Sequence, residues 1–415
     1  HVVWGSLLDG QNARRVVLVT GRAAAPTIDG LTVTRGNATS LTGGCGPNSP
    51  AGCGGGILVY DAGATITDCH ISGNTAVTAT TDPVQAASGG GVSVSYGHGV
   101  VIRDSTISGN TASTVGVGIG GGVALEYCDG CVVEGNRIVG NTATTVAGQS
   151  GRGGGIAITG SGSLLVSVVR NDFLGNAGAP HGLAMGEALS SWDANQVIAG
   201  NHIACNAGQE IVWFRYARGS FSGNRVFGSA ATDRVLDLYS GDGEVLEVDN
   251  NVLVGGGAET VRATAFASYP LAVALRHNTI VGTGVSTGVI VGDHVTVTAT
   301  NNIVTGHFTG LLSPGAGALV ADHTLFWHNN TDGIRGTLAV DGDPAFVNRA
   351  YGDFHIQDRS AARGRGAADG TGRDLDGDAR PGPDGVDIGA DEIAPWWFDF
   401  GTATSPVSAG YTRVT

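Results

Sequence analysis

Hydrophobic and polar positions alternate in a short unit that recurs about ten times along the chain. The unit reads aliphatic, any residue, polar, then Asn or a small residue, any residue, aliphatic, as in Ile66–Ile71 and Val168–Phe173. Its fourth position recurs every 21 to 38 residues, at Leu31, Cys69, Ser105, Asn136, Asn171, Asn201, Asn224, Asn251, Asn278, Asn302 and His323. Strand-like alternation repeated at this period predicts a stacked solenoid rather than a domain with one closed core.

Asparagine fills that fourth position in seven successive repeats, from Asn136 to Asn302. A second asparagine column follows five residues later in the earlier repeats, at Asn74, Asn110, Asn141, Asn176 and Asn206. In a parallel β-coil, equivalent residues lie directly above one another, about 4.8 Å apart. Stacked Asn side chains can then bond to each other and to the turn backbone. We interpret both columns as structural ladders; a row of ligand contacts is the alternative.

The segments around these columns favour strands over helices. Apolar residues alternate with a period of two and are rich in Val and Ile, as in Val100–Ile102 and Val295–Thr298. Glycine accounts for 71 of the 415 residues, well above the usual share of about 7%, so turns interrupt the short strands. The sequence therefore predicts an all-β fold, a single parallel β-helix of about 11 or more rungs.

Four glycine triplets mark the longer repeats of the first half. Each triplet ends a polar insertion and precedes an apolar strand: Gly54–Gly56, Gly89–Gly91, Gly120–Gly122 and Gly153–Gly155. Stacked glycines suit a place where the backbone re-enters the coil tightly. We do not interpret them as nucleotide-binding loops, because no helix follows and the chain contains no Lys to reach a phosphate. We expect Gly-rich loops that project from one side of the first half.

Four segments near the C-terminal end make a resemblance to known proteins specific: Asp343–Phe346, Gly352–Ile356, Asp374–Pro381 and Asp387–Glu392. With the Gly-Gly-Gly-Ile and Ser-Gly-Asn-Thr-Ala cadence of the repeats, they resemble bacterial secreted right-handed parallel β-helix proteins that carry a choice-of-anchor-type C-terminal cap. The resemblance covers roughly residues 1–393. It implies a right-handed coil and a secreted or cell-surface location, but fold alone does not give an activity.

This resemblance also suggests how the chain is divided. We expect the parallel β-helix over residues 1–340, a C-terminal cap segment over 341–393, and an extended tail or the start of a further module over 394–415. The apolar tail contains Pro395–Gly401 and could dock on a second molecule as an added strand. Repeated head to tail, that self-association would build an open filament.

Composition excludes some functions. The formal net charge is −14, and all 22 basic residues are Arg. Without a basic stripe, nucleic-acid binding is not expected. No apolar run reaches 18 residues, so no membrane-spanning helix is expected.

The six cysteines divide into two close pairs and two single residues. We predict local disulfides for the pairs, which are Cys45 with Cys53 and Cys128 with Cys131. Cys69 and Cys205 are four repeats apart, too far to bridge, and we expect both to be reduced and buried. A zinc site at Cys128–Cys131 would need a second ligand pair, and none has the spacing.

The Asp-rich cap segment contains the best candidate for a metal site. Asp374, Asp376 and Asp378 alternate around a glycine, as oxygen ligands do in a Ca²⁺ loop, and Asp387 and Glu392 could complete the shell. The alternative is a turn held by Asp–backbone bonds and by Arg380.

Two residue groups near positions 187–247 bear on sugar chemistry. Hydrolases need two carboxylates about 5–9.5 Å apart, and the candidates here are Asp237 and Glu244, for which a solvated acidic face is the alternative. Exposed aromatics stack on sugar rings whereas buried ones fill the coil; the candidates for carbohydrate binding are Trp192, Trp213, Arg215 and Tyr216. In Trp213-Phe214 we expect at least one ring to face outward.

Two functional classes follow. The first is a non-catalytic extracellular or cell-surface β-helix protein, a stalk, adhesin-like or filament subunit that contacts polysaccharide. The second is a polysaccharide lyase or glycoside hydrolase with its site near residues 187–247. The absence of Lys and of a clear acid pair favours the first class. Apart from Ca²⁺, no cofactor is expected.

Overall fold

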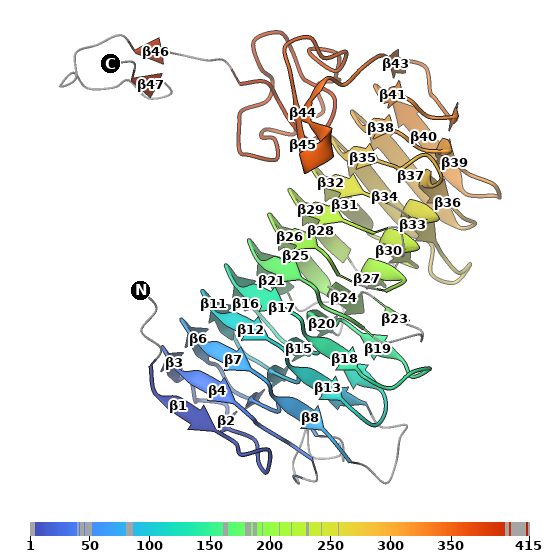
Figure 1. Cartoon of the computed structure of the whole chain (residues 1–415). Helices are drawn as coiled ribbons and strands as arrows, with labels where there is room; N and C mark the ends of the chain where they lie inside the picture. Colours follow the sequence, from blue (N-terminus) through green and yellow to red (C-terminus); the bar gives the residue numbers. More distant parts are fainter. Residues whose placement is uncertain are drawn as a thin grey trace.

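The structure is a computed structural model of the whole chain (Figure 1). It describes residues 5–39, 41, 45, 52–79, 86–160, 165–178, 184–185, 189–192, 194–206, 208–216, 218–229, 232–241, 243–255, 257–394, 398–399 and 412–413. Within these ranges the chain winds into one parallel β-helix with three long sheets. Each coil contributes one strand to each sheet, so the all-β solenoid predicted from the sequence is confirmed.

The strands of each long sheet stack in chain order. The 13-stranded sheet contains β1 (Leu7–Asp9), β4 (Thr32–Thr34), β7 (His70–Ser72), β12 (Thr106–Ser108), β17 (Arg137–Val139), β22 (Asp172–Leu174), β26 (His202–Ala204), β29 (Arg225–Phe227), β32 (Val252–Val254), β35 (Thr279–Val281), β38 (Ile303–Thr305), β41 (Leu325–Trp327) and β43 (Val340–Asp341). The 12-stranded sheet contains β2 (Val17–Thr20), β5 (Ile57–Tyr60), β10 (Val92–Ser95), β15 (Val123–Glu126), β20 (Ile156–Thr159), β24 (Leu189–Trp192), β27 (Glu210–Arg215), β30 (Arg234–Tyr239), β33 (Glu259–Thr264), β36 (Thr287–Val291), β39 (Thr309–Leu312) and β42 (Thr331–Gly333). The 11-stranded sheet contains β3 (Thr27–Asp29), β6 (Thr65–Thr67), β11 (Val101–Arg103), β16 (Cys131–Glu134), β21 (Leu165–Val169), β25 (Asn195–Ala199), β28 (Arg218–Ser222), β31 (Val245–Asp249), β34 (Leu271–Arg276), β37 (Val295–Thr300) and β40 (Ala318–Asp322).

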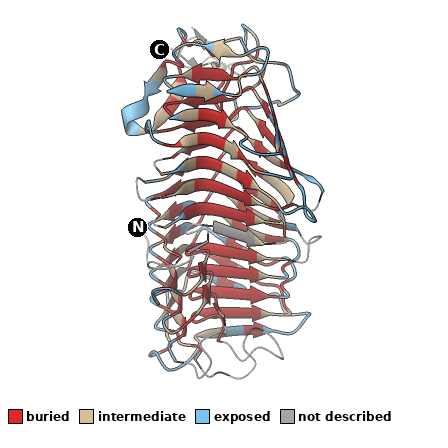
Figure 2. Cartoon of the chain, turned by 90° about the vertical axis from the view of Figure 1, so that its right-hand side faces the viewer, coloured by how far each residue is buried: buried red, intermediate tan, exposed pale blue. Residues whose placement is uncertain are grey.

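Inward residues of all three sheets form one continuous core along the coil axis. In β32 to β41 the inward positions of the 13-stranded sheet are Leu253, Ile280, Val304 and Phe326, all buried in that core. Figure 2 shows the buried residues running along the strands, with exposed residues gathered at the turns. Successive side chains of a strand point to opposite faces of its sheet, so alternate residues point into the core, which explains the period-two pattern.

Both asparagine columns are hydrogen-bonded ladders, as the sequence predicts. Asn251 is fully buried; its Oδ1 accepts the backbone N–H of Asn224 at 2.9 Å, and its Nδ2 donates to Asn278 Oδ1 at 2.9 Å and to the Phe221 carbonyl at 2.8 Å. In the last coil the equivalent position is Thr324, one residue after the predicted His323, because Leu325 is in register with Ile303. Each rung therefore provides hydrogen-bond partners for polar groups that would otherwise be buried in the core without any.

The loops of the first half fold into two small sheets. They are a 3-stranded sheet of β8 (Thr75–Val77), β13 (Thr111–Ser113) and β18 (Thr142–Thr144), and a 4-stranded sheet of β9 (Ala87–Ser88), β14 (Gly118–Ile119), β19 (Gly151–Arg152) and β23 (Ala184–Met185). The glycine triplets return the chain to the coil. A Cβ on Gly90 would lie 2.4 Å from the Thr111 carbonyl carbon, so no side chain fits there.

The 4-stranded sheet lies over part of the 12-stranded sheet. Ser88 of β9 donates to the Glu126 carboxylate of β15 at 2.6 Å. The outward residues Leu58, Ser93 and Ala124 are completely buried, although they point away from the core. The loops therefore cover this face in the first half.

The segment after residue 341 lies along the side of the last coils, against the 13-stranded sheet (Figure 1). It contains β44 (Phe346–Asn348), the 3₁₀ turn η1 (Arg349–Tyr351) and β45 (Asp353–Ile356), with β44 and β45 antiparallel. Ile356 and Ile388 pack on Ile303, and Phe354 packs on Val252. In the described part of the chain after this segment, β46 (Phe398–Asp399) pairs with β47 (Thr412–Arg413).

An outward row of the 13-stranded sheet explains this docking. In β17, β22 and β26 the row holds the exposed residues Arg137, Asp172 and His202. From β32 onward the same row turns apolar or small and is buried, at Val252, Thr279, Ile303 and Leu325. The change of outward pattern is the sequence signal for a covering segment.

Most of the predicted docking tail, residues 394–415, lies outside the described residues, so head-to-tail association stays a prediction. Among the described residues, no helix is long and apolar enough to cross a membrane.

The asparagine ladder yields a stability prediction. Replacing Asn251 with Ala leaves the Asn224 N–H and the Phe221 carbonyl without their partners inside the core. We expect a loss of about 2–4 kcal/mol of unfolding free energy, measured by urea unfolding followed by circular dichroism. Asn330→Ala is the matched control, because Asn330 is exposed. Equal unfolding free energies for the two variants would contradict a stabilising contribution from the hydrogen bonds of the ladder.

Candidate functional site

The outer face of β27, β30 and β33 carries three parallel rows of polar and aromatic residues. Parallel register aligns them as Glu210, Arg234 and Glu259 in the first row, Trp213, Asp237 and Arg262 in the second, and Arg215, Tyr239 and Thr264 in the third. Successive residues of a row lie 24 or 25 positions apart in the sequence yet occupy neighbouring coils. We call this surface the charged face.

Ion pairs link the acids of the charged face to two arginines. Arg234 donates to Glu259 Oε2 and to Glu210 Oε1, each at 2.8 Å. Asp237 lies 3.5 Å from Arg262 Nε and 3.9 Å from Arg234 Nη1. Asp237 Oδ1 and Glu210 Oε2 are buried and accept no hydrogen bond from the described residues. The network therefore sets three carboxyl groups against two guanidinium groups and leaves two carboxylate oxygens without a donor.

Burial dominates the ionisation of the two enclosed acids. It raises the pKa of Glu210 to about 7, with a further contribution from the nearby Asp237 carboxylate. Burial likewise raises the pKa of Asp237 to about 6, against the opposing effect of Arg262 and Arg234. Two carboxyl groups that titrate near neutral pH can exchange protons at working pH, which is the property general acid–base chemistry requires.

Beside the charged face lies a cluster of aromatic rings and arginines. Arg215 is in register with Trp192 below and Tyr239 above, and its Cζ lies 4.7 Å and 5.4 Å from the two ring centroids. Arg152, from β19, lies 4.3 Å from the Trp192 centroid. Tyr216 closes the group at 5.0 Å from Arg215 Cζ. Cation–π attraction can hold this arrangement.

The aromatic cluster continues to the surface through the turns of three coils. Tyr239 meets Phe266 edge to face at 5.2 Å, and Tyr216 meets Tyr269 at 5.0 Å. Phe266 and Tyr269 are 49% and 50% exposed, which leaves much of both rings open to solvent. We call these four rings the aromatic face.

The predicted site residues are only partly brought together. Trp192, Arg215 and Tyr216 do form one cluster. Trp213 points away from the core as predicted, whereas Phe214 points into it. Trp213 is nevertheless only 5% exposed, because Trp192 packs edge to face against it at 6.4 Å. Its ring is therefore covered rather than offered to a ligand.

The two predicted acids occupy different places. Asp237 lies within the 12-stranded sheet, whereas Glu244 is exposed in the turn before β31 and pairs with Arg218 at 3.8 Å. The acid whose pKa the nearby Asp237 carboxylate helps to raise is Glu210, which was not among the predicted site residues. Its signal was present: Glu210 opens a strand whose successors begin with Arg234 and Glu259.

In the cap, four of the five predicted calcium ligands accept hydrogen bonds from protein donors. Asp374 accepts the N–H groups of Asp376, Asp378 and Glu392 at 2.7–2.9 Å. The carboxylate of Asp387 accepts the N–H groups of Gly364 at 2.6 Å and Ile393 at 2.8 Å.

Glu392 is held in a similar way. Its carboxylate accepts from the buried Arg380 at 2.8 Å and from the Gly382 N–H at 2.6 Å. The calcium hypothesis therefore depends on the Asp378 carboxylate and stays a prediction.

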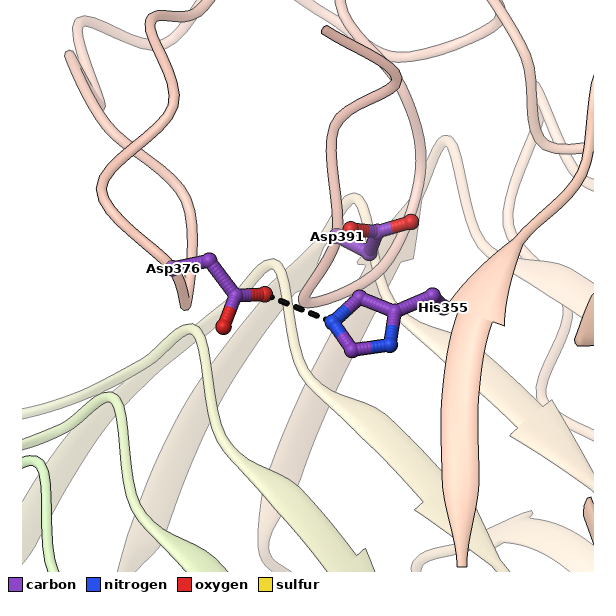
Figure 3. Close-up of side chains that lie close together, drawn as sticks. All are labelled: His355, Asp376 and Asp391. Atoms are coloured by element: carbon purple, nitrogen blue, oxygen red, sulfur yellow. Dashed lines mark hydrogen bonds and ion pairs between the residues drawn. The ribbon is translucent and has the colours of Figure 1, made fainter. Parts of the chain in front are cut away.

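Asp376 is part of a group with His355 and Asp391 (Figure 3). His355 Nε2 donates to Asp376 Oδ2 at 2.8 Å, and the other ring nitrogen bonds Asp353 at 2.5 Å. The Asp376 bond, helped by Asp353, raises the pKa of His355 to about 9. An imidazolium has no lone pair for a metal, so the geometry fits an ion-paired clasp. Arg225 of β29 joins it through Asp376 at 2.6 Å.

The cysteine predictions are confirmed for the pairs and half correct for the single residues. Cys45–Cys53 and Cys128–Cys131 are disulfides. Cys69 is free and buried. Cys205 is free but exposed, which corrects the prediction. It occupies a left-handed corner (φ 58°), and the next residue, Asn206, takes the buried ladder position instead.

The topology defines the class: the chain is an all-β parallel β-helix solenoid. Residues 16–184 match the family model described as right handed beta helix region. A comparison with curated protein sequences found no match. Among solved structures, the chain is similar to PfbA, a surface adhesin of Streptococcus pneumoniae, with 11% sequence identity and a TM-score of 0.37, over 81% of this chain and 80% of that chain. So distant a likeness carries no argument about activity or partners.

The calcium hypothesis has a direct test. It expects 1 mM Ca²⁺, about a typical extracellular site's dissociation constant, to raise the thermal midpoint above that in EDTA. Asp378→Asn should abolish the rise, because no hydrogen bond to the Asp378 carboxylate is among those described. Glu392→Gln should instead lower the midpoint with or without Ca²⁺, since it weakens the buried pair with Arg380. Identical midpoints in Ca²⁺ and EDTA would overturn the hypothesis.

The enclosed acids predict a pH dependence of stability. Because the folded pKa values of Glu210 and Asp237 lie above their unfolded values, the native state holds more protons between pH 4 and pH 7. Their contribution to stability is complete below pH 4 and is lost as pH rises through about 6–7. We expect Glu210→Gln to reduce the decline from pH 4 to pH 8 by about 1–3 kcal/mol, measured by urea unfolding. Glu244→Gln, at an exposed site, is the control. An unchanged decline in Glu210→Gln would contradict the burial argument.

Proposed function

We propose that the protein is a non-catalytic extracellular or cell-surface β-helix protein, a stalk, adhesin-like or filament subunit, that contacts glycans through the aromatic face. The observation that carries this proposal is the meeting of Tyr216, Tyr239, Phe266 and Tyr269 from three adjacent coils. The coil fixes the spacing of these rings, so little freedom is lost on binding.

Ring chemistry favours a sugar as the ligand. Tyrosine offers a flat apolar surface together with a hydroxyl that can hydrogen-bond, at a low cost in side-chain entropy. Half of the surface of Phe266 and Tyr269 stays exposed in a region rimmed by polar side chains. The polar side chains beside the rings are Arg215 and Thr264, and the ion pairs of the charged face lie buried behind them.

Other features favour an extracellular location. Two disulfides suit an oxidising compartment, since cytosolic thiols are kept reduced. The C-terminal segments resemble caps of surface proteins with a choice-of-anchor sorting signal, which would place the solenoid outside the cell. A rigid rod that displays one recognition face then suits a stalk or adhesin-like role.

A specific observation supports a second candidate, a glycoside hydrolase. Glu210 and Asp237 are enclosed acids with raised pKa values beside the aromatic cluster. General acid catalysis uses a carboxyl group whose pKa is raised in this way. Against it, Arg234 bonds Glu210 directly, and both acids are buried below the surface that a polymer would touch. We therefore rank binding above cleavage.

A paired variant tests the proposal. Phe266→Ser with Tyr269→Ser removes the exposed rings while leaving the core intact, and we expect affinity for a bound polysaccharide to fall at least about tenfold. Affinity electrophoresis against neutral and acidic polysaccharides measures the loss. Tyr351→Ser is the matched control, because Tyr351 is 88% exposed and lies in the cap.

Two outcomes would change the conclusion. Equal binding by the paired variant and the wild type would remove the aromatic face from the proposal. Release of reducing ends by the wild type, abolished in Asp237→Asn, would establish the hydrolase instead.

A further inference from the structure

The arginines at the aromatic cluster differ from the two arginines of the charged face in having no acidic partner among the described residues. Arg234 and Arg262 are matched to Glu210, Asp237 and Glu259. Among the described residues, Arg152 makes no side-chain hydrogen bond or ion pair, and Arg215 bonds only the Tyr216 hydroxyl, at 3.3 Å. In a protein with a net charge of −14, two adjacent cations without counter-charges are unexpected.

Their surroundings make this charge costly. Both side chains are half-buried, and the Nε atoms of both are enclosed without a hydrogen-bond acceptor. Burial lowers the pKa of Arg152, and the positive charge of Arg215 lowers it further. A guanidinium carries five N–H donors in a fixed fork and stays charged in proteins. Both therefore keep donors that the fold leaves unused.

Two strands position the guanidinium groups of Arg152 and Arg215 against the indole ring of Trp192. Arg215 comes from β27 of the coil, in register with Trp192 of β24. Arg152 comes from β19, immediately before the glycine triplet that returns the chain to the coil. Both lie within 5 Å of the Trp192 centroid, at 4.3 Å and 4.7 Å. Stacking on the indole fixes the guanidinium planes and leaves their edges to hydrogen-bond.

We propose that Arg152 and Arg215 bind the anionic group, a carboxylate or sulfate, of an acidic glycan whose sugar rings lie on the aromatic face. This inference deepens the proposed function by naming its ligand class, and it depends on that function for the sugar part. Planar guanidinium forks match carboxylate and sulfate oxygens, and such charge-assisted bonds are about twice as strong as neutral ones. The neighbouring acids do not oppose this, because Arg234 and Arg262 already pair with them.

Matched polymers test the anionic group directly. Wild-type protein is measured by affinity electrophoresis and calorimetry against polygalacturonate and its fully methyl-esterified form, and against dextran sulfate and dextran. We expect the acidic member of at least one pair to bind at least about tenfold more tightly. The pair that shows this difference tells carboxylate from sulfate. Binding should weaken as salt rises, since the contact is electrostatic.

Variants then locate the contact. Arg152→Gln and Arg215→Gln should each lose most of the acidic preference, and Arg215→Lys should keep part of it, because the charge remains without the fork. Arg137→Gln is the matched control: Arg137 is exposed on the 13-stranded sheet, and the change in net charge is the same. Thermal unfolding of each variant confirms that it is folded. Retained acidic preference in folded Arg152→Gln and Arg215→Gln would overturn the inference.

The two proposals fail in different ways. If acidic and neutral polymers bind equally, and only the Phe266–Tyr269 variant loses binding, the anion site falls and the glycan-binding function stands. If no polymer binds but methyl glucuronide or sulfate raises the thermal midpoint of the wild type and not of Arg215→Gln, the anion site stands and the glycan-binding function falls. If no probe has any effect, both are overturned.

Discussion

Hydrogen bonding between successive coils is the constraint on which the remaining structure depends. A parallel coil places each residue over its counterpart, so any polar group buried at one level needs its partner at the next level. Asn224, Asn251 and Asn278 meet that need by bonding both the neighbouring side chain and the neighbouring backbone. Once this alignment is fixed, inward positions must be apolar, and chemistry is confined to side chains that point outward.

The outward side chains divide the solenoid into regions with different covers. Loops closed by glycine triplets cover the 12-stranded sheet in the first half, and residues 342–394 cover the 13-stranded sheet along the last coils. Between these covers lie the charged face and the aromatic face. On one side they adjoin the 4-stranded sheet formed by the loops, whose strand β19 supplies Arg152. The candidate site is therefore where one cover ends and the bare sheet begins.

The sequence predicts the coil better than the site, for a physical reason. Asn136 to Asn302 recur at a fixed place in each repeat, and the strand period is local, so both can be read along the chain. The closeness of Glu210 to Asp237 depends on the register of two coils, in which Glu210 aligns with Arg234, and bulges or turns shift such a register by single residues. Trp213 shows a second limit: its outward direction follows from alternation, but its burial depends on Trp192. The docking of the cap could be recognised only from the change from polar to apolar residues along the outward row from Arg137 to Leu325. That row becomes apparent only when the strand register is known.

The sideways docking of the cap has a mechanical consequence. Asn250, His277 and Asn301 occupy corners of three successive coils, and each bonds the cap, through Arg373, Asp369 and Ala367 respectively. A pull applied at Ala394 along the coil axis would therefore load these attachments together, in shear. If the cap lay across the last coil alone, the same pull would peel one strand at a time. Resistance to force should thus be set by several coils acting in parallel, and rupture should be governed by the rate of their joint opening.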